Sequence, residues 1–554
     1  MKSTDPQIAR FNGYYSSDLT GRTQRFSYFI LTVLGFSFWF FMAVPFASHR
    51  ETYSWLATIS NHDIAYAFSN SMSVTYRPLS QATTWLAFLV LDPSKFPTSI
   101  LRQALLQVFV YGMFVLGWWF IYRTTVQRRV FALVAFVAGG VFFSGYVHLF
   151  HIYGIMYAPV MLILGALLGM HAGGTFDKRE MWFAALAILL AFWHPFATAL
   201  FVGFYFGFYM ETFGERSKIQ HLQAVIILIV GTMVSAGFGV LFARKDAATM
   251  SLHTRLFGLL ISYQTTEINR VASAVAFLLT LIVLFNMELS RRLKLALSFI
   301  VAALSLVFLM KGLPVLFLWV CAILIKLFRT QSWSLFFLMV AAALLPLGGG
   351  IGTPIFALFA IIVAVYVTVL GWSPPEKALS FIKARYVIGT TIALLIVVLM
   401  VRAGINVPIV TKVASPLLTE RERTYQLETI LAWLHNSEYC RYRIAFAANA
   451  GSPIDSIDNV ITRRNRPPTG LEDITKFWNT VLSCRNADRT NNKRATALVT
   501  FGEPAWPDLT QVFKVSGKYA GEAAVWVPTK SRGQKVPTCD SSGTVQSALS
   551  PFDK

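Results

Sequence analysis

Repeated apolar runs constrain the fold of this chain more than any other feature. Most are close to the length of about 20 residues that an α-helix needs to cross a bilayer. With a mean hydropathy of +0.56 and only 14% charged residues, the chain is predicted to be an α-helical polytopic membrane protein. The length criterion gives about thirteen spans, at residues 27–47, 103–122, 130–148, 152–170, 181–193, 195–210, 223–243, 271–287, 294–310, 313–328, 333–348, 351–371 and 386–402.

The stretch 181–210 is too long for one membrane crossing. As a single helix it would measure about 45 Å, whereas the hydrocarbon core of a bilayer is about 30 Å thick. Pro195 lies near its middle and lacks the backbone N–H that a continuous helix needs. We therefore predict two half-length helices that meet at Trp193-His194-Pro195.

The Lys and Arg residues predict which loops face the cytoplasm, because cytoplasmic loops are enriched in them. With 181–210 divided in two, the basic loops all fall on one side, while a facing loop holds Lys311 alone. The N-terminus lacks the features of a cleavable signal and is predicted to stay in the cytoplasm. The resulting divisions are a cytoplasmic end at 1–26, a transmembrane domain at 27–402 with outer loops at 48–102 and 244–270, and an extracytoplasmic domain at 403–554.

The C-terminal segment is predicted to be a small soluble α/β domain. Helix-like sequences at 424–436 and 473–484 precede two apolar β-rich runs, TALVTF (496–501) and AAVWVP (523–528). An extracytoplasmic tail permits one disulfide among its three cysteines, and Cys440–Cys484 is the pairing we favour.

Several classes of function are disfavoured by the sequence. The net charge of +21 comes from Lys and Arg at the ends of apolar segments, where topology and membrane lipid account for it, so no nucleic-acid partner is expected. Neither GxxxxGK[ST] nor a GxGxxG after a strand is present, which disfavours an ATP-driven pump, and no cofactor is expected. His148 and His151 are spaced like metal ligands, but no acid lies nearby, so no metal is expected.

The predicted outer side combines few carboxylates with many cations. Glu51 and Asp63 are two of the few acids, and the basic residues include Arg77, Arg244 and Arg270. Such a set suits a ligand whose phosphate is held by cations while a carboxylate removes a proton from a nucleophile. The simpler interpretation of any single Arg or Lys is that it marks topology or contacts a lipid headgroup.

One stretch, SNHDIAYAFSNSMSVTYRPLSQATTW (60–85), carries a family resemblance. Its position after the first span, with an acid near its start and Tyr-Arg-Pro-Leu near its end, resembles the GT-C superfamily. These are integral-membrane glycosyltransferases that use polyprenyl-phosphate-linked sugars. The loop is similar to that of the protein O-mannosyltransferases, and ETYSWLATISNHD followed by YRPLSQATTW is similar in layout to the lipid A aminoarabinose transferases.

The resemblance implies roles for individual residues. The family's catalytic acid lies just after the first span, the position of Glu51, and Asp63 matches a second acid of the loop. Because the paired acids of the mannosyltransferases are missing, either residue remains a candidate for the base of an inverting transfer. Arg77 is the leading candidate to bind the donor phosphate, ahead of Arg244, Lys245, Arg270 and His194. His62, Tyr76 and Trp85 are candidate contacts to the sugar or acceptor.

The implied enzyme moves a sugar from a polyprenyl-phosphate-linked donor to a glycan, lipid or protein acceptor of the cell envelope. The expected location is a bacterial inner membrane, with the reaction on the non-cytoplasmic side. One alternative is an O-antigen polymerase or ligase, although those place a large polar loop late and between spans. The other is a transporter or lipid flippase, although charges inside spans and a repeated half are not apparent here.

Overall fold

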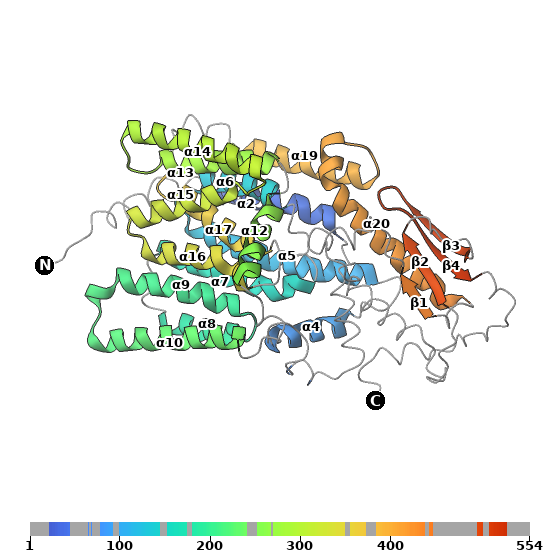
Figure 1. Ribbon diagram of the computed structural model, residues 1–554, viewed down its shortest axis with the longest axis horizontal. Helices are drawn as coiled ribbons and strands as arrows, with labels where there is room; N and C mark the ends of the chain where they lie inside the picture. The colour runs from blue at the N-terminus through green and yellow to red at the C-terminus, as the bar shows by residue number, and fades with distance from the viewer. Residues whose placement is uncertain are drawn as a thin grey trace. The chain divides into compact units, whose positions relative to one another are not determined.

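The computed structural model describes residues 22–44, 65, 68, 78–91, 99–143, 152–173, 180–240, 252–267, 270–348, 355–372, 384–437, 443–446, 496–501 and 509–528. These residues are mostly helical, with one small sheet near the C-terminus (Figure 1). The chain divides into two compact units. The first consists of Met1–Trp39, Gly112–Tyr146 and Tyr157–Val398, and the second of Phe40–Tyr111, Val147–Met156 and Leu399–Lys554.

A helix lies on every apolar run that the sequence marked as a span. These helices are α2 Arg22–Ala43, α5 Ser99–Thr124, α6 Arg128–Phe142, α7 Ile152–Gly173, α8 Glu180–Ala191, α9 Pro195–Glu211, α10 Lys218–Val240, α13 Arg270–Phe285, α14 Arg291–Lys311, α15 Leu316–Arg329, α16 Trp333–Gly348, α17 Ile355–Val369 and α19 Ala384–Arg402. Among the described residues, five helices are long and apolar enough to cross a membrane: those containing Gln24–Ala43, Gly154–His171, Lys218–Ser235, Arg291–Lys311 and Arg385–Arg402. The larger number of about thirteen crossings, expected from the usual span length, stays a prediction.

Two helices lie inside segments that the sequence marked as outer loops. Helix α4 covers Pro78–Leu91, and α12 covers Leu252–Thr266. Helix α12 packs against α16 and α17, and its buried Tyr263 donates a hydrogen bond to the carbonyl of Ala343 at 3.2 Å. The second of these segments is therefore partly a packed helix of the first unit.

The predicted division of 181–210 is confirmed. Helix α8 ends at Ala191, and α9 begins at Pro195. Proline suits this position because the first N–H of a helix has no partner within the helix, so its absence costs no hydrogen bond. His194 precedes it with extended backbone angles, and its Nδ1 accepts a hydrogen bond from the N–H of Phe196 at 3.2 Å. The two helices pack together, and Thr198 donates to the carbonyl of Ala187 at 2.7 Å.

Helices α9 and α16 approach closely through glycines. A Cβ at Gly203 would lie 2.8 Å from the carbonyl oxygen of Phe337, and a Cβ at Gly207 would overlap the carbonyl of Trp333. Small residues at a crossing let two helix backbones come together, which is how helices associate in lipid, where the hydrophobic effect between them is weak.

Replacing Gly207 with Ala is expected to lower the free energy of unfolding by about 1–3 kcal/mol, the usual cost of overpacking. Gly389→Ala in α19 is the matched control, because nothing lies within 4 Å of a Cβ there. Thermal unfolding of the purified full chain in detergent measures both. Equal melting temperatures for the two variants would contradict the close approach.

In the first unit, charged side chains of two helices form hydrogen bonds with backbone groups at the ends of neighbouring helices. The Glu211 carboxylate accepts from the N–H of Ser334 at 2.8 Å, in the first turn of α16. Lys326 is buried and donates to the carbonyls of Val367 and Leu370, at 2.9 and 2.6 Å, where α17 ends. Acids at helix N-termini and cations at C-termini satisfy free backbone groups and complement the helix dipole.

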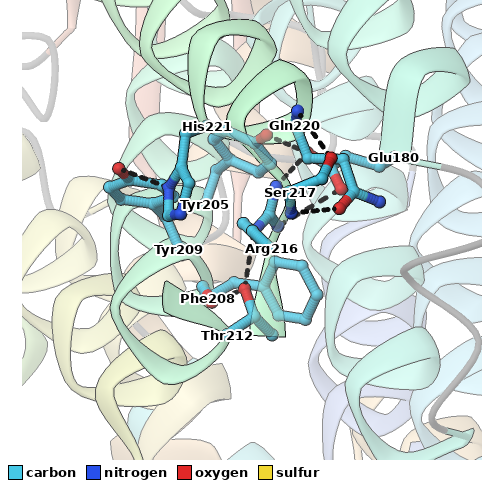
Figure 2. Close-up of polar contacts among 9 residues, drawn as sticks. All are labelled: Glu180, Tyr205, Phe208, Tyr209, Thr212, Arg216, Ser217, Gln220 and His221. Atoms are coloured by element: carbon cyan, nitrogen blue, oxygen red, sulfur yellow. Dashed lines mark hydrogen bonds and ion pairs between the residues drawn. The ribbon is translucent and has the colours of Figure 1, made fainter. Parts of the chain in front are cut away.

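An ion pair joins the start of α8 to the connection between α9 and α10 (Figure 2). After α9 and the short 3-10 helix η6 (Phe213–Glu215), the Arg216 guanidinium meets both carboxylate oxygens of Glu180, at 3.0 and 3.3 Å. It also donates to the hydroxyl of Thr212 at 2.8 Å and lies over the ring of Phe208, while Tyr205 donates to Glu180. Burial lowers the pKa of Arg216, but Glu180 and Tyr205 together outweigh burial, so the pKa of Arg216 is raised.

The C-terminal elements form a four-stranded mixed sheet with a helix against it. The strands are β1 Arg443–Phe446, β2 Thr496–Phe501, β3 Leu509–Gly517 and β4 Gly521–Pro528, in the order β1-β2-β4-β3, and only β1 and β2 are parallel among them. The predicted strands at 496–501 and 523–528 are confirmed as β2 and part of β4. The predicted helix at 473–484 and the Cys440–Cys484 pairing lie outside the described residues.

Helix α20, Pro408–Asn436, contains the predicted helix at 424–436 and packs on β3 and β4. The Trp433 ring stacks on Phe513 with centroids 4.5 Å apart. Glu422 accepts from the N–H groups of Tyr519 and Ala520, at 2.6 and 2.9 Å, in the turn between β3 and β4. These contacts join the helix to the hairpin.

Candidate functional site

Helix α4 begins inside the stretch that carries the family resemblance. Pro78 of the Tyr-Arg-Pro-Leu motif is its first residue, a position that suits proline because its fixed φ matches the helix. Arg77 therefore stands directly before the helix in the sequence, and the polar run Ser-Gln-Ala-Thr-Thr-Trp forms its first two turns.

One face of α4 is polar and buried. Ser80, Gln81, Thr84 and Trp85 have exposed fractions of 0%, 1%, 0% and 0%. Residues at this spacing lie on one side of a helix. Leu86, on the opposite side, is 52% exposed. The helix thus buries polar groups and exposes an apolar one, the reverse of a helix on the surface of a water-soluble protein.

Four polar atoms of this face have no hydrogen-bond partner. They are Ser80 Oγ, Gln81 Oε1, Thr84 Oγ1 and Trp85 Nε1. Each buried polar group left without a partner costs about 1–3 kcal/mol, and such groups are rare in folded proteins. Other described helices also hold such atoms, for example Trp118 Nε1 and Ser305 Oγ, so the distinguishing feature of α4 is that four of them share one face.

Thr83, the neighbour of Thr84, provides a comparison within the same helix. Its hydroxyl donates to the carbonyl of Leu79 at 2.8 Å, the usual local hydrogen bond of a helical threonine. The unpaired state is therefore a property of the buried face and not of the helix as a whole.

Most of the predicted site residues lie outside the described part of the chain: Glu51, His62, Asp63, Tyr76, Arg77, Arg244 and Lys245. Their roles stay predictions. Trp85 is described and belongs to the buried polar face of α4. Its predicted contact with a sugar or acceptor is not tested by this position.

His194 and Arg270 are described in the first unit. His194 is 3% exposed, caps α9, and packs beside Tyr157 with ring centroids 4.8 Å apart. These contacts explain a histidine at this position by helix capping and packing, without a phosphate. Arg270 is exposed as the first residue of α13. Phosphate binding by either residue stays a prediction.

Ser80, Gln81 and Thr84 were not among the residues predicted for the site. The available signal was a polar run at the start of an apolar segment, with positions i, i+1, i+4 and i+5 on one helix face. Among the residues that the structure describes, no group of three or more His, Cys, Asp or Glu side chains could hold a metal ion.

In comparisons with known proteins, the chain matches no family model, no curated protein and no solved structure.

Proposed function

We propose that the chain is an integral-membrane glycosyltransferase that uses a polyprenyl-phosphate-linked sugar. The observation that carries the proposal is helix α4, which presents a buried polar face with four unpaired atoms directly after Arg77. This is the stretch whose sequence resembles the GT-C superfamily. In the sequence, an arginine directly precedes these uncharged hydrogen-bonding residues, a combination that suits a ligand joining a phosphate to a polar ring.

The proposed topology has about thirteen membrane crossings, by the usual length criterion. The helices found on all the predicted apolar runs support it, as do the arginines that begin α6 and α14 near the predicted cytoplasmic side. In this topology the first loop and the C-terminal domain lie outside the cytoplasm, in a bacterial inner membrane. The C-terminal domain binds or positions the glycan, lipid or protein acceptor.

The proposed reaction is a single displacement at the anomeric carbon of the sugar. The acceptor hydroxyl forms the new bond as the bond to the lipid phosphate breaks, so the configuration inverts. Glu51 or Asp63 takes the proton of the hydroxyl, and Arg77 stabilises the charge that develops on the leaving phosphate. The reaction needs no cofactor.

Replacing Arg77 with Ala is expected to raise the KM for the donor about tenfold to a hundredfold, as loss of a hydrogen bond to a charged group predicts. The KM for the acceptor should change far less. Arg77→Lys is the matched control, because it keeps the charge but loses the two-pronged geometry, and it should retain part of the donor affinity. Steady-state kinetics in membranes measure both constants. Equal losses for donor and acceptor would contradict a phosphate contact.

The function as a whole is tested by mass spectrometry of envelope glycans and lipid-linked sugars, with and without the gene. We expect loss of one sugar from an envelope glycan, lipid or protein, and accumulation of the lipid-linked form of that sugar. An unchanged sugar profile together with a transport defect would favour a transporter or lipid flippase.

A further inference from the structure

We propose that four arginines at one end of α2, α5 and α6 bind the headgroup of an anionic phospholipid. They are Arg25 in the first turn of α2, Arg123 in the last turn of α5, and Arg128 and Arg129 at the start of α6. The inference goes beyond the proposed sugar transfer and needs only that these helices lie in a membrane.

Two tyrosine rings and a backbone carbonyl hold two of the arginines in place. The guanidinium carbon of Arg128 lies 5.6 Å from the centre of the Tyr122 ring, and that of Arg129 lies 5.4 Å from the centre of the Tyr28 ring. Arg128 also donates a hydrogen bond to the carbonyl of Arg123 at 3.0 Å. Because aromatic faces attract cations, these contacts fix the two positive charges at defined positions on the protein.

Helix α2 lies beside both of the other helices. The hydroxyl of Tyr122 on α5 donates to the carbonyl of Arg25, and Nε1 of Trp39 on α2 donates to the carbonyl of Gly140 on α6 at 2.8 Å. These contacts bring the arginine-bearing ends of the three helices together. We call the four arginines the arginine patch.

The arginine patch has no carboxylate partner among the residues that the structure describes. Like charges gathered in one place repel each other, and a bound anion relieves the repulsion. Arg123 is exposed and the other three are partly exposed. Nε is the only buried, unpaired atom of Arg25, Arg128 and Arg129, so the outer ends of these guanidinium groups lie at the surface. A headgroup contacts them there without entering the protein.

Exposed apolar side chains beside the patch suit a lipid better than a soluble anion. Phe26 at the start of α2 is exposed, as are Leu116 and Trp119, which share a face of α5 with Arg123. The apolar stretch Gln24–Ala43 of α2 is long enough to cross a membrane, so its arginine-bearing end lies at headgroup level. A ligand with an anionic head and acyl chains contacts both the arginines and the apolar surface.

The chemistry of the patch favours a headgroup with net negative charge. Guanidinium groups bind phosphate oxygens through two parallel hydrogen bonds, which every phospholipid phosphate can accept. A zwitterionic headgroup such as phosphatidylcholine also brings a cation, which no described carboxylate beside the patch would neutralise. Phosphatidylglycerol brings the phosphate without that cation.

The test measures binding of short-chain lipids to the purified full chain in a neutral detergent. The probes are dioctanoyl phosphatidylglycerol, dioctanoyl phosphatidylcholine and inorganic phosphate, and the rise in melting temperature with concentration gives each Kd. We expect phosphatidylglycerol to bind most tightly. Arg128→Gln/Arg129→Gln should raise its Kd about 25-fold, roughly fivefold for each cation near a lipid surface.

Arg291→Gln/Arg292→Gln is the matched control, because it removes the same charge from the exposed start of α14. It should leave the Kd for phosphatidylglycerol nearly unchanged. Arg123→Gln removes an exposed cation without altering the ring contacts, and it should raise the Kd roughly fivefold even if Arg128→Gln/Arg129→Gln does not fold.

Three results would overturn the inference. The first is equal weakening by the patch variants and the α14 control, which would show unspecific attraction to the net charge of the protein. The second is wild-type affinity for phosphatidylglycerol in the patch variants. The third is binding of inorganic phosphate or phosphatidylcholine as tight as that of phosphatidylglycerol, because the patch would then not select an anionic lipid.

Discussion

Glu51→Gln or Asp63→Asn is expected to reduce sugar transfer by about 10²–10⁴-fold, the usual contribution of a general base. Both variants keep the size of the side chain but remove the carboxylate that would take the proton of the acceptor hydroxyl. The variant of the true base should show the full loss, and the other a smaller one. The measurement is transfer from a lipid-linked donor in isolated membranes, with expression and membrane insertion checked by immunoblot.

Asp92→Asn is the matched control, since Asp92 belongs to the same predicted outer loop and has no assigned role. It should keep wild-type activity. Full activity in Glu51→Gln, in Asp63→Asn and in the double variant would show that the family resemblance of this loop is wrong. A normal donor KM with a lost kcat would show that the base acts in the chemical step and not in donor binding.

Arg216→Ala is expected to produce a large loss of stability. It leaves Glu180 without its cation, and breaking a buried ion pair costs about 3–5 kcal/mol. The lower end applies, because the Glu180 side chain is 16% exposed and Arg216 7% exposed. The variant also loses the contact of the guanidinium with the ring of Phe208, 5.4 Å from its centroid. Thermal unfolding in detergent measures the change.

Two controls separate this effect from a general loss of charge. The double variant Glu180→Ala/Arg216→Ala should be more stable than Arg216→Ala alone, because no uncompensated carboxylate remains. Lys514→Ala breaks an exposed pair with Glu522 at 3.7 Å and should change stability by less than about 1 kcal/mol. If Arg216→Ala and Lys514→Ala have the same melting temperature, the ion pair of Arg216 with Glu180 does not stabilise the packing of α8, α9 and α10.

The parts of the fold that follow from local rules could be predicted from the sequence. Pro195 predicted the break between α8 and α9, and the apolar, β-rich run at 496–501 predicted β2. Helices α4 and α12 were not predicted, because the polar residues of 48–102 and 244–270 favoured outer loops. The polar run in the first two turns of α4 interrupts the apolar pattern from which spans are predicted.

The missed parts of the candidate site depend on contacts that sequence spacing does not reveal. Thr83 and Thr84 are adjacent and identical in type, yet one hydroxyl is bonded and the other is not. Outside the candidate site, Arg216 and Glu180 are 36 positions apart and form an ion pair because α8, α9 and α10 pack together. Likewise, His194 looked like a candidate ligand, whereas its capping bond to Phe196 is visible only in three dimensions.

The lengths of the helices in the first unit have a consequence for the lipid around them. Helix α15 has 14 residues, with described residues on either side of it, and is about 21 Å long at about 1.5 Å per residue. Helices α10 and α14, with 23 and 21 residues, reach about 30 Å or more, and much of their apolar surface is exposed. A membrane crossing by α15 would be shorter than the hydrocarbon thickness, so hydrophobic mismatch would draw the headgroup planes together where its exposed Ile325 and Phe328 contact lipid. A thinned bilayer of this kind shortens the path by which a lipid-borne phosphate, or water, reaches the interior of the protein.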